Sequence, residues 1–341
     1  MRGDSMKKRA AALLLFLCLL CALCPPAMAA EDGIRIAVID TGISTTAVDP
    51  ARIAPGNNYI RPQDGTEDKL GHGTAVSAIL VGSEKARIAG ICPTASIVPL
   101  VYYSKNEQGL NVRGDTAMVA QMIYDAVDVY DCKIINISSG SSSDSDSLRD
   151  AVEYAESQGV LIVSCAGNNQ KAKPNAPFYP GGYNSVLCVG AANTDGSIAD
   201  FSQQNEAVDL LALGTDLRVA SIRGTRIRGE GTSYSTAIVT GAAAQIWTNH
   251  PELTAAEVRS AVLTCTRTVG DWRVIDLEAA MNYAPTAEAL SADEESIAAN
   301  PSADVTEDAY YFDTVVCVAQ YGVTGGVDKT HFASDAACTR A

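Results

Sequence analysis

The sequence is poor in histidine and in basic residues, and it has no obvious membrane-spanning segment. Its 341 residues include three histidines, so each is informative as a candidate base. Lysine and arginine together number 25, against 40 acidic residues. The apolar run from Ala10 to Cys24 has 15 residues, short of the roughly 20 that a membrane-spanning helix needs. We therefore expect no transmembrane segment in the mature protein.

The first 29 residues have the parts of a secretory signal peptide. The basic segment "MKKR" precedes the apolar run, and Ala27-Met28-Ala29 has the A-x-A cleavage pattern. The cysteines of the run each follow a leucine, which argues against a lipoprotein anchor. We expect cleavage after Ala29 and a secreted, extracellular protein.

The chain that remains after this cleavage is strongly acidic. Loss of residues 1–29 removes four basic residues and one acidic residue, which changes the net charge from −15 to −18. Such a charge repels nucleic acid and anionic lipid. Seven cysteines remain, an odd number with no C-x-x-C spacing, which argues against a zinc site and against a disulfide framework. We expect no nucleic-acid partner, no metal site, and cysteines that serve as small core residues.

Short runs rich in valine and isoleucine alternate with helical patterns from Ile34 to about Tyr283. The apolar runs lie at 34–39, 96–101, 133–138, 160–164 and 185–191, and the helical patterns at 72–81, 113–130, 146–158, 233–248 and 254–264. Apolar strands separated by helices predict an α/β fold with a parallel sheet covered on both faces. In such sheets, functional side chains gather at the carboxyl ends of the strands.

The composition changes after this region. Residues 285–308 consist largely of Ala, Ser, Asp and Glu with two prolines, which predicts a linker. Residues 309–341 regain aromatic and aliphatic side chains and predict a second, small unit. The expected organisation is a signal peptide at 1–29, a main domain at 30–284, the linker, and this unit.

Four polar residues in the main domain could carry chemistry, and each also has an ordinary structural explanation. Asp40 ends the first apolar run and could form an Asx turn. His72 lies between two glycines at a helix start. Asn168 follows an apolar run and could shape a loop, and Ser233 in "GTSYSTAIVTGAAA" could be a helix N-cap. His250 and His331 have no evident partner. Together, Asp40, His72 and Ser233 follow the chain order Asp, His, Ser that one class of serine protease uses.

With these motifs the chain resembles the subtilisin-like serine peptidases over roughly residues 33–283. The motifs that carry the resemblance are "VIDTGI", "GHGTAVSAI", "INISSG", "SCAGN" and "GTSYSTAIVTGAAA", with "FSQQNEAVDLLALG" and "VIDLEAAM" in support. The resemblance implies a three-layer α/β/α domain. It also implies that Ser233 is the nucleophile, His72 the general base and Asp40 the residue that orients His72.

The same resemblance implies an oxyanion site and a peptide-binding edge. Asn168 and the Ser233 backbone N–H would bind the oxygen of the tetrahedral intermediate. An extended peptide would pair with two segments as an added strand. These segments are Ser138, Ser139 and Gly140, and Ser164, Cys165, Ala166 and Gly167.

Several positions depart from the family pattern. Tyr234 replaces the usual methionine, Ala237 and Ile238 replace a proline and a histidine, and Ala75 and Val76 continue a helix where a histidine is usual. Asp49 matches a calcium ligand, but "VGSEKARIAG" lacks the asparagine-rich loop that supplies the others, so we expect no cofactor and no calcium at that site. Only four residues separate Ala29 from the first strand, so we expect folding without a propeptide.

The tail resembles the start of an S-layer homology repeat, a helical cell-wall-binding unit. The match rests on "GVTGG", "HFASD" and "TRA" within residues 309–341, and a stray terminal helix is the alternative. Such units occur in sets, so we expect more repeats after Ala341. The interpretation is thus a serine endopeptidase that acts on protein or peptide substrates and is attached to bacterial cell-wall polysaccharide. An inactive peptide-binding module and a peptide ligase or cyclase are the alternatives.

Overall fold

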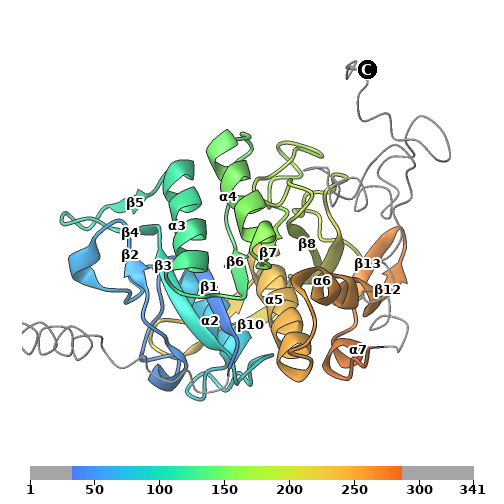
Figure 1. Ribbon diagram of the computed structural model, residues 1–341, viewed down its shortest axis with the longest axis horizontal. Coiled ribbons are helices and arrows are strands. Elements are labelled where there is room, and N and C mark those ends of the chain that lie inside the picture. Colours follow the sequence, from blue (N-terminus) through green and yellow to red (C-terminus); the bar gives the residue numbers. More distant parts are fainter. Residues whose placement is uncertain (1–32, 286–341) are drawn as a thin grey trace, which may run out of the picture. The chain divides into compact units, whose positions relative to one another are not determined.

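The computed structural model describes residues 33–285 (Figure 1). The predicted signal peptide, nearly all of the predicted linker, the predicted repeat and His331 lie outside the described residues. Within the described part, no helix has the length and apolar character needed to cross a membrane.

A nine-stranded sheet forms the centre of the described domain (Figure 1). In spatial order, its strands are β12 (Thr266–Val269), β13 (Trp272–Ile275), β9 (Leu210–Leu213), β8 (Leu187–Ala192), β7 (Leu161–Cys165), β6 (Ile134–Ile137), β1 (Arg35–Asp40), β3 (Ser96–Val101) and β2 (Asn57–Asn58). Every neighbouring pair is parallel except β12 and β13. The predicted, mostly parallel sheet is confirmed.

Helices cover both faces of this sheet. Successive side chains of a strand point to opposite faces. Ile36 and Val38 of β1 pack in one core with α2, α5 and α6, while Ala37 and Ile39 pack in a second core with α3 and α4. All four side chains are buried, and full burial of an isoleucine or valine contributes about 1.5–3 kcal/mol. The strands therefore read as continuous apolar runs because both of their faces are covered.

Five of the six described α-helices coincide with predicted helical segments. The helices are α2 (His72–Val81), α3 (Thr116–Asp128), α4 (Asp146–Ser157), α5 (Thr232–Asn249), α6 (Ala255–Thr264) and α7 (Leu277–Met281), and the short 3-10 helices are η1 (Pro50–Arg52) and η2 (Pro62–Asp64). Helix α3 begins three residues later than predicted. The reason is that the Asp115 carboxylate accepts from the Met118 N–H and caps the helix there.

Two antiparallel hairpins lie outside the main sheet. They are β4 (Tyr103–Lys105) with β5 (Asn111–Arg113), and β10 (Leu217–Ala220) with β11 (Arg226–Gly229). The first leads into α3, and the second leads into α5. Helix α5 therefore follows a strand of a separate hairpin, not a strand of the central sheet.

Candidate active site

Asp40 lies at the carboxyl end of β1, the strand between β3 and β6. It is only 2% exposed. A buried carboxylate is costly unless it is paired or hydrogen-bonded. Its Oδ1 accepts a hydrogen bond from the Thr41 backbone N–H at 2.7 Å, and the remaining interactions come from a histidine.

His72 is the partner of Asp40. His72 is the first residue of α2. Its Nδ1 lies 2.8 Å from Oδ1 and 2.8 Å from Oδ2 of Asp40. A carboxylate can only accept, so Nδ1 carries the proton and Nε2 of the neutral ring keeps its lone pair. The structure thus brings together two predicted site residues that lie 32 positions apart, in the tautomer that a general base requires.

The surroundings of His72 favour its protonated form. Burial is the largest influence and lowers the pKa, but the charge and hydrogen bond of Asp40 and the charge of Asp68 outweigh it. The pKa of His72 is therefore raised above its ordinary value of 6.5. Because the side chain keeps 36% exposure, the ring can still meet a substrate.

Asp68 holds the segment that presents His72, a role that the sequence analysis missed. Its Oδ1 accepts from the N–H groups of Leu70 and Gly71, and its Oδ2 accepts from the N–H and hydroxyl of Thr74. It is buried, with 3% exposure. One carboxylate thereby satisfies backbone donors at the start of α2, which have no acceptor within the helix. The sequence contained one signal for this role, an acidic residue, Asp68, four positions before a histidine at a helix start.

Gly73 lets α2 approach the end of β1 closely. A Cβ atom added there would lie 2.3 Å from the Gly42 carbonyl oxygen and 3.2 Å from the Asp40 Cβ. The Gly73 N–H donates to the Thr41 hydroxyl at 2.8 Å. A larger residue would push His72 away from Asp40, so glycine is the residue that fits.

Ser233 is the second residue of α5, whose N-cap is Gly231. The N-cap interpretation of this serine is therefore wrong. Its Oγ instead donates to the Ser138 carbonyl oxygen at 3.0 Å, and the Ser138 hydroxyl donates to the Ser233 carbonyl at 3.1 Å. Within residues 33–285, no hydrogen bond joins Ser233 to His72.

A buried polar chain supports this serine from behind. The Thr240 hydroxyl donates to Asn136 Oδ1 at 3.0 Å, and Asn136 Nδ2 donates to the Ser138 hydroxyl at 3.0 Å. Asn136 and Thr240 are both 0% exposed. Satisfied networks of this kind fix side-chain positions in a core. Sequence reasoning assigned no role to either residue.

Asn168 is exposed and lies beside the first turn of α5. Its Oδ1 accepts from the Thr232 backbone N–H at 2.9 Å and from the Thr232 hydroxyl at 2.8 Å. Because an N–H needs an acceptor, these bonds fix which side of the amide carries the oxygen. The amide nitrogen is left to donate elsewhere. The Ser233 N–H also lies in the first helical turn, where N–H groups lack an intrahelical acceptor.

The predicted peptide-binding segments follow two adjacent strands, β6 and β7. Ser139 and Gly140 line a pocket of about 310 Å³, and Ser138 lies next to Ser233. Ser164 and Cys165 belong to β7, and the segment from Ser164 to Gly167 is buried. Peptide contact by this second segment stays a prediction.

Tyr234 occupies the position after the serine. Its ring centroid lies 5.8 Å from that of His72, with the planes inclined by 33°. Burial and the charge of Asp40 raise the pKa of its hydroxyl. The tyrosine therefore stays neutral and forms a partly buried wall beside the imidazole.

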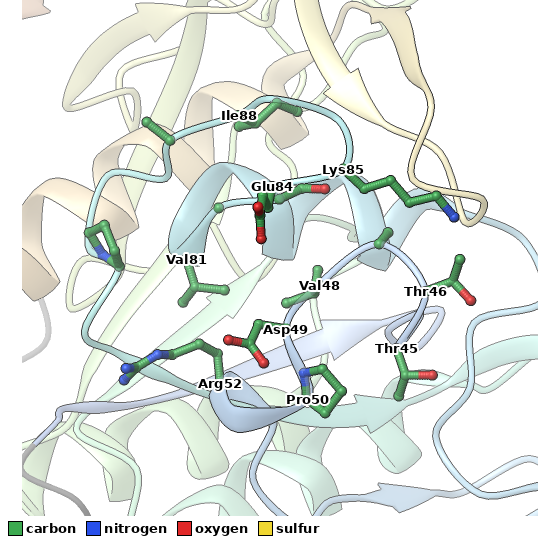
Figure 2. Close-up of a pocket in the computed structure, with 15 residues that line it drawn as sticks. Thr45, Thr46, Val48, Asp49, Pro50, Arg52, Val81, Glu84, Lys85 and Ile88 are labelled. Atoms are coloured by element: carbon green, nitrogen blue, oxygen red, sulfur yellow. The ribbon is translucent and has the colours of Figure 1, made fainter.

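Asp49 lies in a separate surface pocket of about 930 Å³ (Figure 2). Its Oδ1 accepts from the Ala51 N–H and caps η1, while Arg52 and Lys85 lie at the margins of the pocket. The described residues contain no cluster of three or more His, Cys, Asp or Glu side chains arranged to hold a metal ion. That this site binds no calcium stays a prediction, and we assign no chemical step to it.

His250 and the cysteines within residues 33–285 have structural roles. His250 Nε2 lies 2.9 Å from the Tyr283 carbonyl oxygen, and Nδ1 lies 3.3 Å from Glu252, so the expectation that it has no partner was wrong. The five cysteines in the described part are free and buried, as predicted.

Comparisons with known proteins identify the family to which the chain belongs. The sequence profile of the subtilase family matches residues 31–287. A thermostable alkaline protease from Halalkalibacterium halodurans is 31% identical over 232 residues, 68% of this chain and 61% of that protease. The chain thus spans about three fifths of that relative. Subtilisin BL from Lederbergia lenta is 30% identical over 230 residues, 67% of this chain and 81% of the relative.

Solved structures give the same result. A cold-adapted subtilisin-like serine proteinase aligns with a TM-score of 0.61 and 25% identity, covering 71% of this chain and 88% of that one. The S41 psychrophilic protease aligns with a TM-score of 0.60 and 28% identity, covering 69% and 83%. The chain therefore belongs to the subtilase family of serine-type endopeptidases.

Proposed function

We propose that this protein hydrolyses peptide bonds with Ser233 as nucleophile, His72 as general base and Asp40 as the orienting carboxylate. The observation that carries the proposal is the pair of 2.8 Å contacts between His72 Nδ1 and Asp40, which leaves Nε2 free to accept a proton. A module that only binds peptides does not need the Asp40–His72 pair. It also does not need a serine in the first turn of α5 or the exposed Asn168 amide.

Attack requires the Ser233 hydroxyl to exchange its hydrogen-bond partner. Ser233 Oγ leaves the Ser138 carbonyl by rotation about χ1 and turns toward His72 Nε2. The hydrogen bond it gives up contributes about 0.5–1.5 kcal/mol, so binding of a substrate can readily offset it. Catalytic hydrogen bonds that form only in the substrate complex are common.

The chemistry then proceeds in two halves. Ser233 Oγ bonds to the carbonyl carbon while its proton passes to His72 Nε2, and Asp40 stabilises the imidazolium. The imidazolium gives that proton to the leaving amine, the C–N bond breaks, and an ester to Ser233 remains. Water then attacks the ester with the same proton transfers and releases the acid. The Asn168 amide and the Ser233 N–H donate to the transient oxyanion, which the N-terminus of α5 also favours.

Replacement of Asn168 tests the oxyanion assignment. We expect Asn168→Ala to lower kcat by about 10²–10³ with little change in KM, a magnitude known from subtilisin itself. The reason is that the oxyanion exists only after attack. Steady-state kinetics on one chromogenic peptide measures both constants.

Asn169→Ala is the matched control because Asn169 is also exposed and adjacent. It should keep wild-type kcat. An Asn168→Ala variant that loses affinity but not turnover would place this amide in substrate binding instead.

We also propose that the enzyme is secreted and attached to the cell wall. The support is the signal-peptide pattern of residues 1–29 and the S-layer homology resemblance of residues 309–341. The protein from residue 30 to residue 341 should sediment with purified cell-wall polysaccharide, whereas a form ending at residue 285 should stay in solution. Equal sedimentation of both forms would contradict the attachment.

A further inference from the structure

The pocket of about 310 Å³ extends the predicted peptide-binding edge away from the serine. Ser139, Gly140 and Ser141 line this pocket together with Arg113, the last residue of β5. Ser138, which touches Ser233, is two residues from Gly140. Since an extended chain rises about 3.3 Å per residue, the lining residues Ser139 and Gly140 lie about 3 to 7 Å along the chain from the serine contact. Side chains two to four residues before the scissile bond are in range.

Arg113 is an exposed cation without a carboxylate partner. Its Cζ lies 5.4 Å from the centre of the Tyr102 ring, and its Nη2 donates to the Gly140 carbonyl at 3.0 Å. Within residues 33–285, it forms no salt bridge. A guanidinium has five N–H donors in a planar fork that matches a carboxylate. Most of these donors are unused.

Other groups in the pocket are compatible with an anion. Burial raises the pKa of Tyr102 to about 12, so its hydroxyl stays a neutral donor. The Ser141 hydroxyl oxygen accepts from the Ser143 N–H, which leaves its proton free to donate. Asp115 is the one carboxylate of the lining. It accepts from the Met118 N–H at the start of α3, where the helix dipole partly compensates its charge.

We propose that this pocket selects peptides with an acidic side chain two to four residues before the scissile bond, and that Arg113 is the specificity-determining residue. The inference rests on the proposed peptidase function. In a chain of net charge −15, Arg113 supplies a local attraction where the protein as a whole repels acidic peptides.

The Gly140 carbonyl links side-chain recognition to backbone pairing. In the described structure, Arg113 occupies this acceptor. A peptide paired as an added strand needs such carbonyls for its own N–H groups. A substrate carboxylate that draws the guanidinium toward itself releases the Gly140 oxygen for the peptide backbone. An acidic side chain therefore stabilises the bound peptide in two ways. It forms an ion pair with Arg113, and it makes the Gly140 carbonyl available to a peptide N–H group.

The test compares peptides that differ at one position only. Glu, Gln or Lys is placed in turn two, three or four residues before a fixed cleavage site, and kcat/KM is measured for each peptide. We expect wild type to prefer Glu over Gln by about two- to fivefold at one of these positions, as suits an exposed ion pair. The ratio should fall to near one in Arg113→Gln and should be partly kept in Arg113→Lys. Arg113→Glu should prefer Lys.

Arg149→Gln is the matched control, because Arg149 also packs over a tyrosine ring but is paired with Asp144 and Asp146 outside this pocket. It should keep the preference for Glu. A wild-type ratio near one at every position, a preference for Lys, or a Glu preference that survives in Arg113→Gln would overturn the inference and leave the peptidase function standing. Failure of wild type to cleave any of the peptides would refute the function itself.

Discussion

Ser233→Ala and His72→Ala should each lower peptide hydrolysis by about 10⁶-fold, a magnitude known for the corresponding losses in subtilisin, and the double variant should be scarcely worse. The nucleophile and the base act as one unit, so once one is lost the other has nothing to activate. Labelling by a fluorophosphonate probe reads the activated serine directly and should disappear in the same variants. Hydrolysis of a chromogenic peptide gives the size of the effect.

The chain offers matched controls for both substitutions. Ser235 lies in the same helix, and its hydroxyl bonds to the Leu213 carbonyl, so Ser235→Ala should keep probe labelling. His250→Ala removes a histidine that bonds to Tyr283 and should keep turnover. Wild-type turnover in Ser233→Ala would show that this hydroxyl serves only its bond to Ser138.

Asp40→Asn should lower kcat by about 10⁴-fold, less than the loss of the serine. An asparagine amide can donate to Nδ1, which would stabilise the tautomer whose Nε2 carries the proton and cannot accept another. The imidazole remains in place, so some activity should survive. Equal losses in Asp40→Asn and Ser233→Ala would argue that Asp40 does more than orient the ring.

The same variant should change the pH dependence of the remaining activity. His72 must be neutral to act as a base, and its pKa is raised by Asp40, so wild-type kcat/KM should fall as the pH drops through a value above 6.5. Without the Asp40 charge, the lowering effect of burial dominates, and the acid limb should move to lower pH. Asp49→Asn makes the same change in net charge and should leave the limb in place.

Local sequence predicts the strands and the candidate site residues because the pattern that marks each of them is short. The strands around β1, β6 and β7 are apolar throughout, and their doubly buried environment follows from that pattern. Asp40 and His72 stand next to the glycines and strand end that position them. Strand β12 escaped prediction because its sequence TRTV is partly exposed and lacks a continuous apolar run.

The supporting residues could not be found in this way because their partners are distant in the sequence. Thr240 meets Asn136 across 104 positions, and Thr232 meets Asn168 across 64. The sequence around a single threonine in a helix does not show whether its hydroxyl bonds to a distant side chain or only packs against its neighbours. The orientation of Ser233 toward Ser138 was also outside sequence reasoning, since it depends on the rotamer of one side chain.

The wide spacing of the site residues governs when the enzyme can act during its own synthesis. Contacts between Asp40 and His72 span 32 positions, and those between Ser138 and Ser233 span 95. Structures rich in such long-range contacts fold slowly, since distant segments must meet before any contact forms. Helix α5 is also among the last parts of the domain to be synthesised. With the roles proposed above, a partly made chain that ends before α5 contains His72 but lacks Ser233, so it cannot yet cleave itself.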